Sequence, residues 1–99
     1  MWFAIMSEDV ADSTSLRQKH RPAHLARLHD LASQDRLLVA GPHPKTDEAT
    51  PAEPSFTGSL VVAMFDSLED AQAWAAQDPF ILNQVYARTT VKPFKLVLP

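Results

Sequence analysis

The sequence predicts a single α+β domain over residues 1–99, with a four-stranded antiparallel sheet and helices on one of its faces. Four short apolar segments alternate with two amphipathic segments in the order β-α-β-β-α-β. Both amphipathic segments have apolar residues at three- and four-residue spacing, as helices that cover a sheet do. The 99 residues suffice for one hydrophobic core and not for two. This order of elements is the ferredoxin-like, or split βαβ, arrangement.

The first strand is expected at residues 2–6, a bulky apolar run that polar residues follow at once. A helix is expected to begin after the N-cap residue types at 12–15, where Ser15 and Gln18 have the spacing of a capping box. Pro22 interrupts the helical pattern, because an internal proline removes a backbone hydrogen bond. Either one helix bends there, or one helix ends before Pro22 and a second begins with it. The apolar stripe of this region consists of Leu25, Leu28, Leu31 and Ala32.

The second and third strands are expected at residues 36–40 and 59–65, which are short apolar runs. Residues 41–58 lie between them and contain both glycines and four of the eight prolines, which favours an irregular connection. Because prolines restrict flexibility, we expect a fixed arm that covers a cleft or contacts a partner subunit, rather than a mobile lid.

The second helix is expected to begin with a cap at residues 66–67 and to continue through Gln77. Its apolar stripe consists of Leu68, Ala71, Trp74 and Ala75. Asp78 precedes a proline, so it ends this helix and can also cap a further short helical turn. The fourth strand is expected at residues 85–98, where Pro93 requires a sheet edge or a bulge.

Two of the expected strands are apolar on both faces, although the helices cover only one face of the sheet. The alternating residues are Trp2, Ala4 and Met6 against Phe3 and Ile5, and Leu60, Val62 and Met64 against Val61, Ala63 and Phe65. A monomer would expose the uncovered face as a large apolar patch, which soluble monomers rarely do. We therefore expect a homodimer in which two sheets pack together.

Composition and charge exclude several classes of protein. The net charge of −3 argues against a broad nucleic-acid interface, which needs a basic surface. No apolar run approaches the roughly 18 residues of a membrane span. The absence of cysteine excludes disulfides, thiolate nucleophiles and cysteine-ligated zinc. Since the start of the chain also lacks the basic region of a secretory signal, we expect a cytoplasmic protein without nucleic-acid or membrane partners.

Several short segments, in a fixed order along the chain, together resemble a known family. They are RPAHLARL (21–28), RLLVAGP (36–42), FTGS (56–59), SLEDA (67–71), DPF (78–80) and VKPFK (91–95). The set is similar to the YciI-like (YCII-related) family of small ferredoxin-like proteins that form a dimeric α/β barrel, and the similarity covers essentially the whole chain. This resemblance implies a site built on a histidine and an aspartate, which by position are His24 and Asp78. It implies no particular substrate.

His24 is the first candidate for a chemical role. At about 100° per residue it falls between Leu28 and Leu31 on the helical wheel, so its side chain faces the sheet. A histidine among leucines is more often a core residue than a catalyst, and the sequence leaves both roles open. Asp78 has a simple structural role as an N-cap. Both of its roles are compatible, because one carboxylate oxygen can accept a backbone N–H while the other accepts the imidazole N–H.

Four further residues are candidates for substrate binding: Arg21, Ser59, Phe80 and Tyr86. Arg21 could bind a substrate carboxylate or phenolate, or be a solvated charge at a helix bend. Ser59 follows a glycine at the start of a strand, where it has either a structural role or a place at the mouth of a cleft. The two aromatic residues, together with Trp74, line a pocket or belong to the core.

Neither a metal nor an organic cofactor is expected. His20 and His24 have the spacing of a helical metal site, but Pro22 disrupts that turn, and there is no HExxH motif or glycine-rich phosphate loop. We therefore expect a cofactor-independent enzyme of lyase or isomerase type for a small molecule. In it His24 moves a proton, Asp78 orients the histidine and Arg21 binds an anionic substrate. The alternative is a non-catalytic or accessory module that binds a small ligand in the same cleft.

Overall fold

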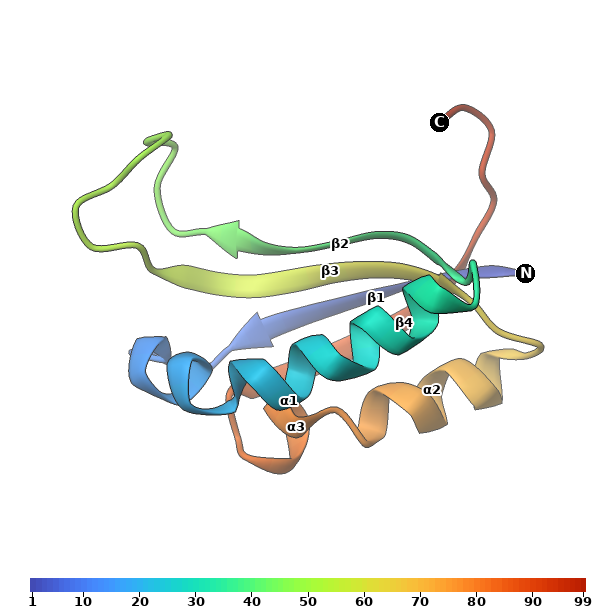
Figure 1. Ribbon diagram of the computed structural model, residues 1–99, viewed down its shortest axis with the longest axis horizontal. Helices are drawn as coiled ribbons and strands as arrows, with labels where there is room; N and C mark the ends of the chain where they lie inside the picture. Colours follow the sequence, from blue (N-terminus) through green and yellow to red (C-terminus); the bar gives the residue numbers. More distant parts are fainter.

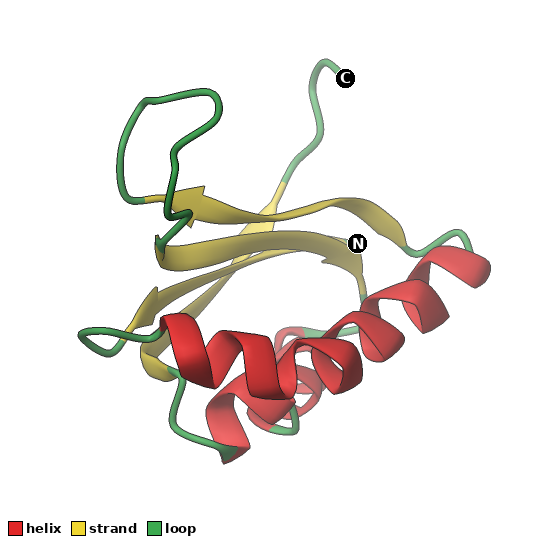
Figure 2. Cartoon of the chain, turned by 60° about the vertical axis from the view of Figure 1, so that its left-hand side comes forward, coloured by secondary structure: helices red, strands yellow, loops and turns green.

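The computed structural model describes all of residues 1–99. Its elements, in chain order, are β1 (Trp2–Asp9), α1 (Thr14–Ser33), β2 (Leu37–Pro44), β3 (Phe56–Met64), α2 (Leu68–Ala76), α3 (Pro79–Leu82) and β4 (Tyr86–Phe94). The strands form one antiparallel sheet in the order β2-β3-β1-β4. All three helices lie on one face of that sheet (Figures 1 and 2). The predicted α+β, ferredoxin-like arrangement is confirmed, and α3 is the short helical turn expected after Asp78.

The core lies between the helices and the inner face of the central strands β1 and β3. These two strands pair along most of their length, with Phe3 opposite Ala63 and Ile5 opposite Val61. The buried core cluster consists of Phe3, Ile5, Leu28, Leu31, Val61, Ala63, Phe65, Ala71 and Ala75. β1 continues three residues beyond the expected end at position 6, because Ser7 and Glu8 pair with both neighbouring strands and Asp9 pairs with β4.

α1 is one continuous helix of 20 residues, and Pro22 lies on its exposed side. Of the two alternatives for this region, the single helix is observed. The capping box expected at Ser15 is wrong, because the helix begins at Thr14 and its N-cap is Ser13. Ser13 makes no side-chain capping bond, since its hydroxyl donates instead to Asp9 at 2.6 Å. The start of α1 is thereby tied to the end of β1.

The β2–β3 hairpin has longer strands and a shorter connection than expected. β2 extends through Pro44 and β3 begins at Phe56, so residues 45–55 connect them instead of 41–58. Pro42 and Pro44 fit within β2 because it is an edge strand, where a missing N–H need not face a neighbouring strand. β4 is the opposite edge strand, which suits Pro93, and it ends at Phe94.

Gly58 allows β3 to approach β1 closely near the end of β1. It pairs with Glu8, and a Cβ atom built on it would lie 2.1 Å from the carbonyl oxygen of Ser7. Such a contact excludes any side chain, so glycine is required at this position. The Gly58 carbonyl oxygen accepts a hydrogen bond of 2.9 Å from Arg17 of α1. The close approach of the two strands therefore places the Gly58 carbonyl where Arg17 of α1 binds it.

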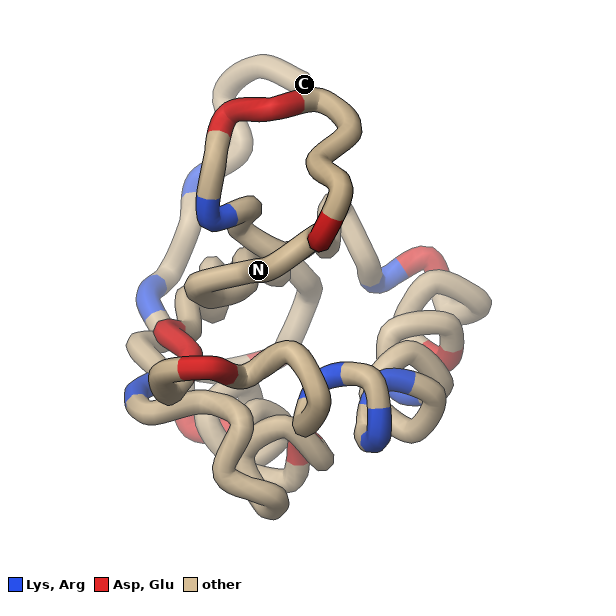
Figure 3. Tube along the Cα trace, turned by 90° about the vertical axis from the view of Figure 1, so that its left-hand side faces the viewer, with Lys and Arg blue, Asp and Glu red and all other residues tan.

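The remaining helices follow the sequence signals closely. Ser67 caps α2 by accepting the N–H of Asp70, and Asp78 caps α3. Two positions of the predicted stripes, Ala32 and Leu68, are exposed instead of buried. Basic and acidic positions are intermingled along the chain (Figure 3). None of the helices is both long enough and apolar enough to cross a membrane.

Candidate active site

A cleft of about 460 Å³ lies between α1 and the β2–β3 hairpin. Apolar side chains of α1 and of the sheet form most of its wall, including Leu25, Leu28, Leu37 and Val61. The polar side chains that line it are Thr14, Arg17, Gln18, Arg21, His24, His29 and Ser59. Pro54, at the end of the hairpin connection, also contributes to the lining. A mostly apolar cleft of this size with a few convergent polar groups is typical of small-molecule sites.

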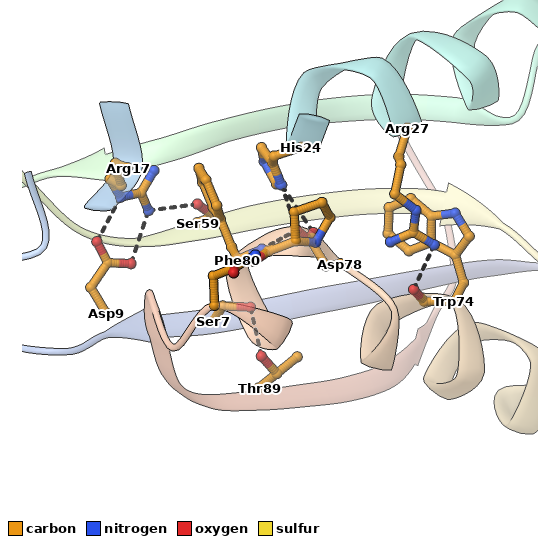
Figure 4. A network of polar contacts seen from close by, with 12 residues as sticks. Ser7, Asp9, Arg17, His24, Arg27, Ser59, Trp74, Asp78, Phe80 and Thr89 are labelled. Carbon is orange, nitrogen blue, oxygen red and sulfur yellow. Dashed lines mark hydrogen bonds and ion pairs between the residues drawn. The ribbon is translucent and has the colours of Figure 1, made fainter. Parts of the chain in front are cut away.

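His24 and Asp78 are in direct contact beside this cleft (Figure 4). The Nδ1 atom of His24 lies 2.8 Å from Oδ1 and 3.0 Å from Oδ2 of Asp78, and both residues are buried, at 7% and 6% exposure. An ionised carboxylate can only accept, so Nδ1 carries the proton and donates it. The lone pair is thereby left on Nε2, which forms no hydrogen bond within the chain. In this tautomer the free nitrogen is a base.

Asp78 caps a helix and binds His24 at the same time, the two roles that the sequence analysis found compatible. Its Oδ1 accepts the backbone N–H of Phe80 at 2.9 Å, which caps α3, and Pro79 occupies the start of that helix. The same carboxylate accepts the imidazole N–H of His24. Because the cap fixes the carboxylate and the carboxylate fixes the ring, the orientation of His24 is set by the start of α3.

Two aromatic side chains hold the imidazole from different directions. The Phe80 ring is stacked on His24, with 4.0 Å between centroids and an interplanar angle of 6°. Tyr86 meets His24 edge-on at 6.4 Å and Phe80 edge-on at 5.4 Å. Phe80 is part of the cleft wall, whereas Tyr86 lies behind it. Burial raises the pKa of Tyr86 to about 12, and the Ser59 hydroxyl and the Arg17 cation offset only part of that effect.

Arg17 and Asp9 form a second polar cluster, which the sequence reasoning missed. Arg17 donates from Nε to Oδ2 of Asp9 at 2.6 Å and from Nη2 to Oδ1 at 2.9 Å. Nη2 also donates to the Gly58 carbonyl and to the Ser59 hydroxyl, each at 2.9 Å. The predicted residue Ser59 therefore lies in the site as a partner of Arg17. A signal was present in the sequence, because Arg17 precedes His24 by seven residues, or two helical turns, and so shares its face.

The other candidate residues are spread around the cleft. Arg21 lines it but is exposed and forms no hydrogen bond within the chain. Trp74 lies away from it, where Arg27 stacks on its ring at 4.3 Å and donates to its carbonyl at 2.8 Å. Burial lowers the pKa of Arg27, and the negative charge of Asp78 opposes that shift. The structure thus brings His24, Asp78, Phe80 and Tyr86 together, with Ser59 beside Arg17 and Arg21 at the rim.

No cluster of three or more histidine, aspartate or glutamate side chains is arranged to hold a metal ion. His20, the partner that helical spacing offered to His24, is half-buried and does not line the cleft. The polar groups that converge on the cleft are suited to proton transfer and to binding anionic oxygen.

The comparisons with known proteins agree with this fold. Residues 1–95 match the YCII-related domain, so the chain belongs to the YCII-related family. It is 52% identical over 97 residues to the protein YciI of Escherichia coli O6:H1, covering 98% of this chain and 99% of that one. It is 46% identical, with the same coverage, to an uncharacterized protein of Haemophilus influenzae.

A solved structure is also similar over nearly the whole chain. It is the 5-chloro-2-hydroxyhydroquinone dehydrochlorinase of Burkholderia phenoliruptrix AC1100, in complex with 2,5-dihydroxybenzoquinone. The TM-score is 0.84 at 28% sequence identity, covering 96% of this chain and 94% of that chain. A protein of this fold therefore acts on a small hydroxylated ring.

Proposed function

We propose that this chain is a cofactor-independent enzyme of lyase or isomerase type, in which His24 transfers a proton and Asp78 orients it. One observation supports this most directly. The Nδ1 atom of His24 is bound to the buried Asp78 carboxylate, while Nε2 remains free on a residue that lines an apolar cleft. A histidine that served only to fill the core would bury both nitrogens among satisfied partners.

The substrate class we propose is a small hydroxylated or enolisable ring. The cleft volume of about 460 Å³ lies in the range for ligands of this size, and its wall is mainly apolar. The dehydrochlorinase of the same fold acts on a chlorinated hydroxyhydroquinone. The stacked Phe80 ring gives the cleft a flat aromatic surface beside His24.

In the proposed reaction, Nε2 of His24 takes a proton from a C–H or O–H bond of the substrate. The electron pair of that bond forms a new C=C or C=O bond. In a lyase step a leaving group departs with its own electron pair, and in an isomerase step the proton returns at another carbon. Asp78 favours the imidazolium that forms in between, because its negative charge lies within 3.0 Å of the ring.

The test compares His24→Gln and Asp78→Asn with the wild type. Release of chloride from 5-chloro-2-hydroxyhydroquinone and deuterium uptake by a set of enolisable cyclic compounds in heavy water would both be measured. We expect each variant to lower the rate by about 10²- to 10⁴-fold, because a positioned general base contributes that much. His20→Gln is the matched control, since His20 is on the same helix but outside the cleft lining.

If both variants turn over and bind a substrate like the wild type, the proposed mechanism is wrong. If the wild type binds these rings but neither exchanges protons nor eliminates chloride, the alternative of a ligand-binding module replaces it.

We also propose that the chain forms a homodimer through the outer face of its sheet, and that it works in the cytoplasm, in keeping with its lack of cysteine. On that face Met6 and Met64 are 36% and 37% exposed, beside the half-buried Trp2 and Leu60. Exposed apolar side chains grouped on one surface are typical of an interface.

Light scattering at micromolar concentration tests the dimer. We expect a mass of twice the 11.0 kDa chain for the wild type and of a single chain for Met6→Lys, because a buried unpaired ammonium opposes association. Leu82→Lys is the control, since Leu82 is 61% exposed on the helical side of the molecule. A monomeric wild type would contradict the proposal.

A further inference from the structure

One nitrogen of the Arg17 guanidinium group has no hydrogen-bond partner, although the residue is buried. Its Nε and Nη2 atoms make all four of its hydrogen bonds, to Asp9, to the Gly58 carbonyl and to Ser59. The Nη1 atom makes none, and it is not sealed in the interior, because the only buried side-chain polar atom without a partner is Nη1 of Arg27. Arg17 lines the cleft, and in Figure 4 its remaining nitrogen points away from Asp9.

We infer that Arg17 is the oxyanion-binding residue of the cleft, and that its Nη1 donates to an ionised ring oxygen, a phenolate or an enolate, of the molecule on which His24 acts. This inference rests on the proposed function and deepens it, because it assigns a charge and a position to one group of the substrate. It also moves the anion-binding role from Arg21, where the sequence placed it, to Arg17.

The distances fit a ligand with one ring. Arg17 and His24 are seven residues apart on α1, on the same face. The Cζ atom of Arg17 lies 5.1 Å from the centre of the Phe80 ring, and the His24 ring centre lies 4.0 Å from it on the stacked side. The guanidinium carbon is therefore at most about 9 Å from the imidazole centre, the sum of these distances. The two groups are therefore no farther apart than a six-membered ring with a hydrogen bond at each end can reach.

The surroundings of Arg17 favour an anionic oxygen over a neutral one. Phe56, Phe80 and Tyr86 place their rings 5.1–5.8 Å from its Cζ atom, so the guanidinium lies in largely apolar surroundings, where a charge-assisted hydrogen bond is stronger than in water. The Tyr86 phenol stays neutral at ordinary pH, since burial raises its pKa to about 12, and it therefore adds no competing anion. Asp9 compensates the charge of Arg17 and holds the guanidinium in one orientation, which makes the free end a directed donor.

Arg21 lacks these features. It lines the same cleft but is exposed and has no partner that fixes its side chain. A mobile charge at the rim is screened by water, so its contribution to binding is small.

The test uses 4-nitrophenol as the probe, because its phenolate form has a visible absorbance of its own. 4-Nitroanisole, in which a methyl group replaces the ionisable proton, is the matched uncharged probe. We expect wild-type protein to bind 4-nitrophenol more tightly as pH rises through the ionisation of the probe, and to hold it as the phenolate. Arg17→Met is expected to weaken phenolate binding by about 10- to 100-fold, the size of a charge-assisted hydrogen bond, and to leave 4-nitroanisole binding unchanged.

Two variants control this result. Arg88→Met removes an arginine that also pairs with a β1 carboxylate, Glu8, but lies outside the cleft, and it should bind the phenolate like the wild type. If Arg17→Met fails to fold because Asp9 is left unpaired, the double variant Arg17→Met with Asp9→Leu replaces both charges and takes its place.

Equal affinity of the wild type for the phenolate and for 4-nitroanisole would overturn the inference, with or without any variant. So would phenolate binding that survives the loss of Arg17. The proposed function fails separately, because His24→Gln is expected to lose turnover and yet to keep phenolate binding. A His24→Gln variant with normal turnover would refute the acid–base role and leave the oxyanion role in place.

Discussion

Glu8 and Asp9 are neighbours at the end of β1, and each binds an arginine, but on opposite faces of the sheet. Glu8 pairs with Arg88 of β4, and their side chains are 61% and 76% exposed. Asp9 pairs with Arg17 of α1, and their side chains are 1% and 10% exposed. Successive residues of a strand point to opposite faces, which separates the two pairs. The register with β4 also shifts between Glu8 and Asp9, a bulge that re-aims the last side chain of the strand.

The two pairs show how burial changes what one kind of ion pair can do. The exposed pair joins two neighbouring strands, and neither side chain makes a hydrogen bond to a third residue. The buried pair also engages a backbone carbonyl, a serine hydroxyl and three aromatic rings, two of which line the cleft. A buried pair is expensive to break and is held in one geometry, whereas an exposed pair is screened and mobile. Only the buried pair can present a directed donor to a ligand.

The comparison predicts that Asp9→Asn and Glu8→Gln have very different costs. We expect Asp9→Asn to lower the free energy of unfolding by about 3–5 kcal/mol, because it leaves the buried Arg17 cation uncompensated. Glu8→Gln should cost less than about 1 kcal/mol, since water solvates both of its partners. Urea unfolding followed by circular dichroism measures both values. Similar losses of unfolding free energy in the two variants would contradict this prediction and would mean that water reaches Arg17 as freely as Arg88.

The order of the elements could be predicted from the sequence because apolar periodicity is a local property. The limits of the strands could not be predicted. Ser7, Glu8 and the prolines of β2 are residue types that do not favour strands, yet in the structure they pair within the sheet. Pairing with a neighbouring strand, rather than local preference, keeps them extended. The exposure of Ala32 has a similar cause, because the face of α1 that is buried centres on Arg17, His24 and Leu28, and Ala32 lies about 40–80° away from them on the wheel.

The family resemblance implied a site of His24 and Asp78, and in the structure the two side chains are in contact. The Asp9–Arg17 pair was missed for a physical reason. The sequence predicts that the first strand ends before Asp9, so it gives no reason to place Asp9 in the sheet. Arg17 is charged, and charged residues are mostly exposed to solvent. The burial of this pair depends on Gly58, which brings β3 close enough for its carbonyl to meet Arg17. The contact involves β1, α1 and β3 together, so no pattern within a single segment of the sequence predicts it.

The pKa of Tyr86 measures how well water reaches the surroundings of Arg17. Tyr86 is the only tyrosine of the chain, so the ultraviolet absorbance of phenolate reports it alone. It pairs with Asp9 across the bulge, and its ring lies 5.8 Å from the Arg17 Cζ atom. We expect the pKa of Tyr86 to be about 12 in the folded protein, because burial disfavours the phenolate, and about 10, the ordinary tyrosine value, when the chain is unfolded in denaturant.

The raised pKa also fixes the sign of a stability change. Between pH 10 and 12 the unfolded chain has lost the Tyr86 proton while the folded protein keeps it, so the free energy of unfolding falls as pH rises. The full stabilisation is present below pH 10, and two pKa units correspond to a loss of about 2–3 kcal/mol by pH 12. Tyr86→Phe lacks the group and should lose less stability over the same interval, with every other titrating residue held in common. A pKa near the ordinary tyrosine value of about 10 in the folded protein would mean that water reaches the phenol. The Asp9–Arg17 pair would then be nearly as well solvated as the Glu8–Arg88 pair.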